Sequence, residues 1–182
     1  MSLETEKKVT NESPAVVFLD IDGVVNTPWW CFSQTDGWRS RYNFPEDGQV
    51  NNTQAVQWVS EFCLKFRYDL VISSTWRKGI TLTTLQNILD QSGLRPGIKV
   101  IGKTPCLDWI NSASKEPAQR GDEISSWLAA HPEIDRYLIF DDDCDMGKHM
   151  DHLVKTRCDA GFLEEDYVAA MNKHLFLYPG SE

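Results

Sequence analysis

Short apolar runs recur along this chain, and each has the length and composition of a strand buried on both faces of a parallel sheet. The runs cover residues 15–19, 69–74, 98–101, 137–140 and 153–156. Between and after them, apolar residues recur at the three- and four-residue spacing of an amphipathic helix. That spacing predicts one helix after an N-cap at Asn51-Asn52, one from Leu82 to Gly93, and two over residues 121–130 and 164–175.

Strands that alternate with helices indicate an α/β fold, a Rossmann-like parallel sheet with helices on both faces. The pattern extends over residues 15–178, which we interpret as a single domain. Residues 1–14 form a polar leader without an apolar signal core. Residues 27–49 are rich in Trp and show no clear periodicity, so we interpret them as an insert after the first strand.

Polar side chains gather where the predicted strands end. They are Asp20 and Asp22 after the first strand, Ser73 and Ser74 at the second, Lys103 after the third, and the acidic run from Asp141 after the fourth. The carboxyl ends of parallel strands lie along one edge of a sheet, where α/β proteins bind their ligands. We therefore expect these residues to meet in one crevice.

The pair Asp20 and Asp22 predicts a metal-assisted site, because two carboxylates this close repel each other unless a cation or a proton lies between them. For phosphoryl transfer, Asp20 is the candidate nucleophile. Asp22 is the candidate acid for the leaving oxygen and base for the attacking water. Asp141, with Asp142 or Asp145, can complete an oxygen-ligand Mg²⁺ site.

Phosphoryl transfer also requires hydrogen-bond donors and positive charge around the transferred group. Ser73 can hydrogen-bond a phosphoryl oxygen, and Arg120 adds a fixed charge at the start of a predicted helix. The full set of candidate phosphate-binding residues is Ser73, Ser74, Gly23 and Arg120.

Each of these features has a structural alternative. The pair with Gly23 is also typical of a solvated Asp-Gly turn, and Ser73-Ser74 of hydroxyls that cap the next turn. Arg77 and Arg120 are each compatible with an ordinary ion pair. The run from Asp141 to Asp145 can be a solvated loop or a Ca²⁺-binding stretch, although it lacks the ligand order of an EF-hand. The series of motifs favours the site over these separate readings.

Composition narrows the class of protein. The chain is 41% hydrophobic and 25% charged, which is typical of a globular protein, and no apolar stretch reaches the length of a membrane span. Its net charge of −9 disfavours a broad electrostatic footprint on nucleic acid. Five cysteines without metal-site spacing indicate free thiols in a reducing compartment, so we expect a cytoplasmic protein.

The order of the motifs resembles the haloacid dehalogenase (HAD) superfamily of phosphotransferases. The resemblance implies that Asp20 is the nucleophile, Asp22 the acid and base, and Ser73, or Ser74 in the alternative register, the hydroxyl of the second motif. In RGDEISSWL, Arg120 stands where the family usually has Lys, and Lys103 in VIGKTP is the competing cation. In FDDDCD, the family separation pairs Asp141 with Asp145, while Asp142 is the alternative metal contact.

More narrowly, LDIDGVVN, VISSTWR, VIGKTP, RGDEISSWL and IFDDDCDM resemble the HAD domains found beside RNA-repair enzymes. This implies a Mg²⁺-dependent phosphatase that forms an aspartyl-phosphate and can act on RNA or DNA termini. It also implies that residues 27–49 form a short flap, with no large cap domain. The flap residues Trp29, Trp30, Trp38, Arg39 and Arg41 either hold a substrate base and phosphate or pack the flap onto the body.

Other functions stay open at this point. The same fold can serve a phosphoprotein or small-metabolite phosphatase, or a phosphate-binding domain without activity. A receiver domain of a response regulator is disfavoured. That fold has its acidic pair on the first strand and its acceptor Asp on a middle strand, whereas here the order is reversed, with the candidate acceptor Asp20 after the first strand.

Overall fold

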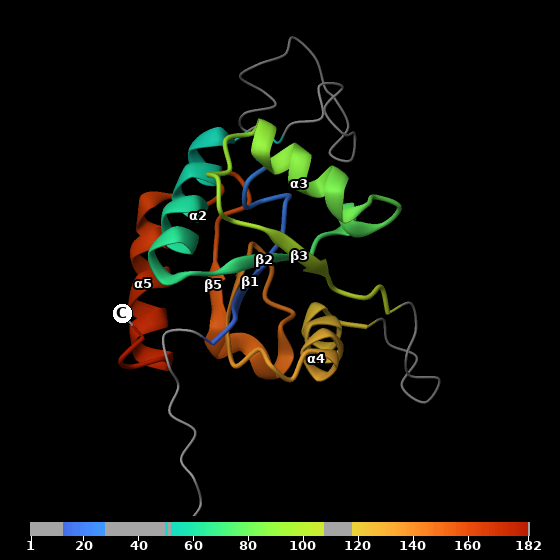
Figure 1. Cartoon of the computed structure of the whole chain (residues 1–182), viewed down its shortest axis with the longest axis vertical. Coiled ribbons are helices and arrows are strands. Elements are labelled where there is room, and N and C mark those ends of the chain that lie inside the picture. Colours follow the sequence, from blue (N-terminus) through green and yellow to red (C-terminus); the bar gives the residue numbers. More distant parts are fainter. Residues whose placement is uncertain (1–12, 28–49, 51, 108–117, 182) are drawn as a thin grey trace, which may run out of the picture.

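The computed structural model describes residues 13–27, 50, 52–107 and 118–181. Its centre is a sheet of five parallel strands in the order β3-β2-β1-β4-β5 (Figure 1). The strands are β1 (Ala15–Leu19), β2 (Asp69–Ile72), β3 (Val100–Lys103), β4 (Arg136–Asp141) and β5 (Leu153–Lys155). The α/β class predicted from the sequence, with a Rossmann-like parallel sheet, is confirmed.

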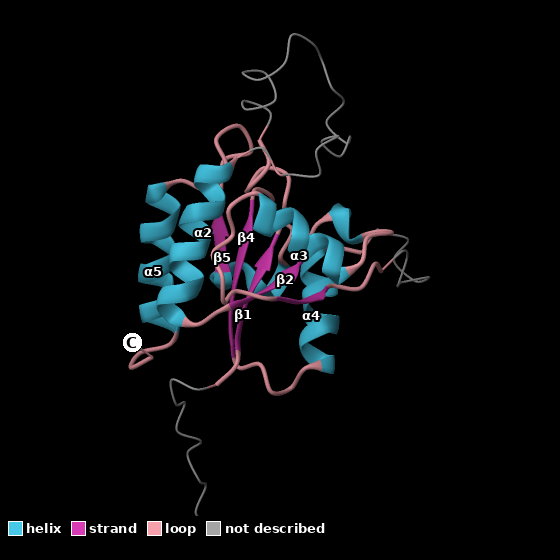
Figure 2. Ribbon diagram, turned by 45° about the horizontal axis from the view of Figure 1, so that its top comes forward, coloured by secondary structure: helices cyan, strands magenta, loops and turns pink. Residues whose placement is uncertain are grey.

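Helices follow most of the strands. They are α2 (Thr53–Phe66), α3 (Leu82–Gln91), α4 (Arg120–Ala130), α5 (Glu164–Leu177) and the short 3₁₀ helices η1 (Thr75–Arg77) and η2 (Gly147–His152). Helix α2 begins where the sequence predicts, because the side chain of Asn52 accepts a hydrogen bond from the amide of Ala55 at 3.1 Å. Helices α2 and α5 lie side by side (Figure 2).

The two faces of the sheet carry separate cores, since successive side chains of a strand point to opposite faces. From β1, Val17 and Leu19 join the core that includes residues of α2, α3 and α5. Val16 and Phe18 face the other way and pack with Ile124 and Trp127 of α4. The Phe18 and Trp127 rings meet edge to face with centroids 5.4 Å apart. Helices therefore cover both faces of the sheet, and the ends of the strands are where a ligand can reach it.

Two strands differ from the prediction by two residues at one end or both, whereas the ends of β4 and β5 differ by one residue at most. The third strand begins at Val100, where pairing with Leu70 of β2 starts. It ends at Lys103, which pairs with Ile72, the last residue of β2. Gly97, with φ +103°, turns the chain just before it, so Ile98 is outside the strand. The second strand ends at Ile72 because Ser74 already caps η1, accepting a hydrogen bond from the amide of Trp76.

The predicted leader and flap fall almost entirely outside the described residues. This applies to residues 1–12 and 28–49, and hence to the flap residues Trp29, Trp30, Trp38, Arg39 and Arg41. Among the helices that are described, none is long and apolar enough to cross a membrane.

Candidate active site

Asp20 lies at the centre of the carboxyl edge of the sheet. It directly follows β1, which is flanked by β2 and β4. Its amide donates to the carbonyl of Phe140 at 2.9 Å, and the amide of Ser73 donates to the carbonyl of Leu19 at 2.9 Å. These bonds prolong the sheet pairing by one residue on both sides. The Asp20 carboxylate is thereby held against the ends of both neighbouring strands, and its residue is 7% exposed.

Three carboxylates converge at this edge. Asp20, Asp141 and Asp142 each offer one oxygen, and these oxygens all lie within 4.8 Å of one another. Asp141 ends β4 and is buried, whereas Asp142 follows it and is partly exposed. The prediction that the first and fourth strands bring their acidic residues together thus matches the geometry of these three residues.

Gly23 makes room for one member of the cluster. Its backbone has φ +82°, a conformation that favours glycine, and a Cβ atom there would lie 2.3 Å from Cγ of Asp142. The Thr156 hydroxyl donates to the carbonyl of Gly23 at 2.8 Å and fixes the loop from the far side. The positive φ and the lack of space for a Cβ atom each require glycine at position 23. Its absent side chain lets the Asp142 carboxylate lie beside the loop that follows β1.

The cluster has more negative charge than its protein partners balance. Burial raises the pKa of Asp20, while Arg120 and a hydrogen bond from Ser74 oppose the shift. Burial, and then the neighbouring Asp20, raise the pKa of Asp141. One oxygen of Asp141 accepts from the backbone amide of Asp143 at 2.9 Å, but its buried Oδ2 accepts no hydrogen bond from any residue that the structure describes. A hard divalent cation fits this donor set, because it would satisfy that oxygen and relieve the repulsion.

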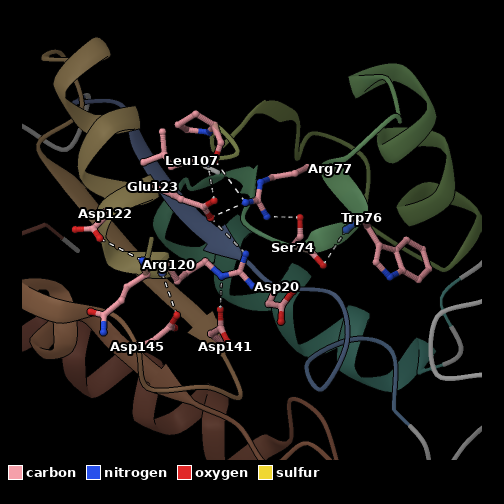
Figure 3. A network of polar contacts seen from close by, with 12 residues as sticks. Asp20, Ser74, Trp76, Arg77, Leu107, Arg120, Asp122, Glu123, Asp141 and Asp145 are labelled. Atoms are coloured by element: carbon pink, nitrogen blue, oxygen red, sulfur yellow. Dashed lines mark hydrogen bonds and ion pairs between the residues drawn. The ribbon is translucent and has the colours of Figure 1, made fainter. Parts of the chain in front are cut away.

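Arg120 is the cation that acts on the two buried carboxylates, Asp20 and Asp141, whereas Lys155 acts on Asp142. The Nε of Arg120 lies 3.6 Å from Oδ2 of Asp141, and its Nη1 lies 3.7 Å from Oε2 of Glu123 (Figure 3). It is the first residue of α4, and its own backbone amide donates to the carboxylate of Asp145. Lys103, the competing cation, lies elsewhere: its Nζ donates to the carbonyls of Arg77 and Ile80, at 3.0 and 2.7 Å. Lys103 thus fixes the chain after β2.

Asp145 and Asp142 have different places. The carboxylate of Asp145 accepts from the amide of Arg120 at 3.0 Å, and its carbonyl accepts from the amide of Gly121 at 3.1 Å. Asp145 therefore caps the start of α4 and orients Arg120. Over the described part of the chain, the carboxylate cluster contains Asp142 and does not contain Asp145.

The two serines after β2 point to different surroundings. The side chain of Ser74 hydrogen-bonds the carboxylate of Asp20. Ser73 is fully buried, and its hydroxyl has no hydrogen-bond partner among the described residues. Ser74 is thus the serine in contact with the candidate nucleophile, in the alternative register that the sequence left open.

Asp22 lies close to the cluster but its oxygens are engaged by other groups. Oδ2 accepts from the indole Nε1 of Trp76 at 3.0 Å, and Oδ1 accepts from the side-chain amide nitrogen of Asn26 at 2.7 Å. Asp22 also contributes to a raised pKa of Asp142, after burial and Asp143. The residue is half-buried.

A buried ion pair supports the site, and in it Arg77 has the ion-pair role that the sequence left open, with a partner, Glu123, that the sequence did not indicate. Arg77 and Glu123 pair at 2.5 Å, with side chains 3% and 11% exposed. Arg77 also donates to the carbonyl of Ser74 at 2.6 Å, and Glu123 accepts from the amide of Leu107 at 3.2 Å. The pair joins the chain after β2, the chain after β3 and the start of α4. The sequence signal for this pair is weak: Glu123 stands three residues after Arg120, a spacing that places both side chains on one side of a helix.

Comparison with known proteins agrees with this geometry. Residues 16–167 match the family described as the HAD domain in Swiss Army Knife RNA repair proteins. That range holds the described parts of the site, from Asp20 to Asp145. Curated proteins gave no match.

Proposed function

This chain belongs to the family of HAD domains in Swiss Army Knife RNA repair proteins, a phosphatase-type hydrolase family, and from this we propose that it is a Mg²⁺-dependent phosphomonoesterase. The observation that carries the proposal is the set of three converging carboxylates, Asp20, Asp141 and Asp142, beside one arginine. Such an excess of buried negative charge destabilises a protein unless a ligand compensates it.

In the proposed reaction, an oxygen of Asp20 attacks the phosphorus of the monoester in line with the leaving oxygen. The bond from phosphorus to the leaving oxygen breaks, and Asp22 gives that oxygen its proton. Asp22 then takes a proton from water, whose oxygen attacks phosphorus and releases inorganic phosphate and the free Asp20 carboxylate. Arg120 and the Ser74 hydroxyl stabilise the negative charge on the transferred group.

Mg²⁺ would be held by Asp20, Asp141 and Asp142, and when bound it supplies charge neutralisation at the phosphoryl oxygens. Asp20 must be ionised to attack, and burial disfavours that form. Arg120 opposes that effect of burial, and a bound cation beside Asp20 would favour the carboxylate form further.

For the substrate we propose phosphorylated ends of nucleic acid, with RNA first. The support is the description of the family. The net charge of −9 favours contact with a terminal phosphate at one site over contact along a backbone. A reducing compartment is also part of the proposal, supported by the free thiols of Cys63, Cys106, Cys144 and Cys158.

The first experiment measures hydrolysis of 4-nitrophenyl phosphate with Mg²⁺. We expect turnover that EDTA suppresses and that Asp20→Asn abolishes, while Glu61→Gln, on the exposed side of α2, retains it. Continued hydrolysis by Asp20→Asn would place the nucleophile elsewhere, and no turnover by the wild type on any monoester would favour a phosphate-binding domain without activity.

The second experiment compares substrates: RNA and DNA with 3′- or 5′-phosphates, phosphopeptides, nucleotides and sugar phosphates. The proposal predicts the highest kcat/KM for a polynucleotide end. A preference for phosphopeptides or for free metabolites would assign the same chemistry to a different substrate.

A further inference from the structure

The carboxylate of Asp22 is held from two sides by uncharged donors. Trp76 donates its indole N–H to Oδ2 at 3.0 Å, and the side-chain amide of Asn26 donates to Oδ1 at 2.7 Å. The two donors come from different parts of the chain, the loop after β1 and helix η1 after β2. Together they fix both the direction and the plane of the carboxylate.

The loop after β1 is folded so that Asn26 returns to Asp22. The amides of Val25 and Asn26 both donate to the carbonyl of Ile21, at 3.0 and 2.9 Å, and the amide of Gly23 donates to the carbonyl of Asn26 at 2.7 Å. Val24 and Val25 are buried and anchor the loop in the core. The position of Asn26 is thus set by backbone bonds to Ile21 and Gly23, the residues on either side of Asp22.

Trp76 is placed independently. Its residue is 8% exposed, and its amide donates to the hydroxyl of Ser74 at 3.4 Å. The next residue, Arg77, is held by Glu123 and by the carbonyl of Ser74. Figure 3 shows Trp76 at the end of this network, beside Ser74. The indole N–H is therefore presented by a rigid turn.

We propose that Trp76 and Asn26 are positioning residues that act through Asp22, and this rests on the proposed function. A general acid must lie within hydrogen-bond distance of the leaving oxygen, and small displacements of such a group cost large factors in rate. Two fixed donors hold the Asp22 side chain in one rotamer before the substrate arrives.

The test uses Trp76→Phe, which removes the indole donor and keeps an aromatic ring, with Trp58→Phe as the matched control. Trp58 packs on Tyr167, 5.3 Å between ring centroids, and belongs to α2. The substrates are phenyl phosphate, whose leaving oxygen needs a proton, and 4-nitrophenyl phosphate, whose leaving oxygen leaves readily as an anion. We expect Trp76→Phe to lower kcat/KM about tenfold for the first and about threefold or less for the second.

A double-mutant cycle with Asp22→Asn gives the decisive readout. If Trp76 acts through Asp22, Trp76→Phe has almost no effect in the Asp22→Asn background, because the group that it positions is already lost. Equal losses on both substrates, or a loss that persists in the Asp22→Asn background, would show a merely structural role and overturn the proposal. Asn26→Leu, near-isosteric and without the amide, is the second variant, with the same expected pattern.

Failure of this inference and failure of the proposed function give different results. If the wild type hydrolyses both substrates and Asp20→Asn does not, the function stands, and the variants at Trp76 and Asn26 decide the inference alone. If the wild type hydrolyses neither substrate, the function fails and the positioning role fails with it. Thermal unfolding of each variant identifies any that fails to fold, in which case its partner variant supplies the result.

Discussion

Two ionic clusters lie next to each other at the carboxyl edge of the sheet, and they differ in whether their positive and negative charges balance. In the pair of Arg77 and Glu123, one positive group meets one negative group at 2.5 Å, and neighbouring backbone groups complete the hydrogen bonding. In the group of Asp20, Asp141 and Asp142, Arg120 acts on the two buried carboxylates, and one buried oxygen accepts no hydrogen bond from the described residues.

This difference separates support from chemistry. A balanced pair stabilises its surroundings only while both partners are present, because removing one leaves a buried charge. An unbalanced cluster is least stable alone and most stable with a ligand of opposite charge. Arg120 touches both clusters, since it contacts Asp141 on one side and Glu123 on the other. The balanced pair thus holds the cation that the unbalanced cluster requires.

The largest expected effect on stability comes from breaking the balanced pair. Glu123→Gln leaves the Arg77 guanidinium buried without a counter-charge, and we expect a loss of about 3 kcal/mol or more in the free energy of unfolding. Chemical denaturation measures it. The control is Glu61→Gln at the exposed pair with Arg95, for which we expect a loss below about 1 kcal/mol. Equal losses in the two variants would contradict the role given to Glu123.

The unbalanced cluster gives the next effect, in the opposite sense. Mg²⁺ at a hundred times its Kd should stabilise the wild type by about 2.7 kcal/mol, since binding to the folded state alone adds to its stability. Thermal unfolding with and without Mg²⁺ measures this. In Asp141→Asn the stabilisation should largely disappear, and the metal-free variant should be no less stable than the wild type because one repelling charge is gone. A variant that is strongly destabilised without metal would show that the carboxylates support the fold.

A third effect is the pH dependence of stability without metal. The pKa values of Asp20 and Asp141 are raised by burial above their ordinary value of 3.8, so the folded state binds protons more tightly than the unfolded state. Their contribution to stability is therefore fully present below about pH 4 and is lost as the pH rises through the folded-state values. Unfolding measured in EDTA should show this decline, and Asp20→Asn should flatten it. A curve of the same slope in both proteins would assign the decline to other groups.

Much of the fold follows from the sequence because its strands are apolar runs and its helices carry clear periodicity. The run from Ala15 to Leu19 could be placed because five buried residues ended at a carboxylate. The apolar run predicts a third strand that begins two residues too early, because Ile98 is apolar but directly follows the turn at Gly97. Apolar character predicts burial, and only pairing with β2 decides where the strand begins.

The site was predictable where residue type and strand end coincide, as at Asp20 and Asp141. Choices that depend on side-chain direction were not. Ser74 contacts Asp20 because the strand ends one residue before Ser73 and the chain turns there into η1. Asp145 could not be separated from Asp142 by spacing, because its role as a cap of α4 is a contact between distant segments.

The most direct test of the central claim is trapping of the phosphorylated carboxylate by its analogue. Beryllium fluoride with Mg²⁺ forms a phosphoryl mimic on an ionised aspartate, and thermal unfolding reports its formation. We expect the two together to raise the Tm of the wild type well above the value with Mg²⁺ alone, and to leave that of Asp20→Asn unchanged. No additional rise in the wild type, or an equal rise in Asp20→Asn, would contradict the assignment of Asp20 as the group that receives the phosphoryl.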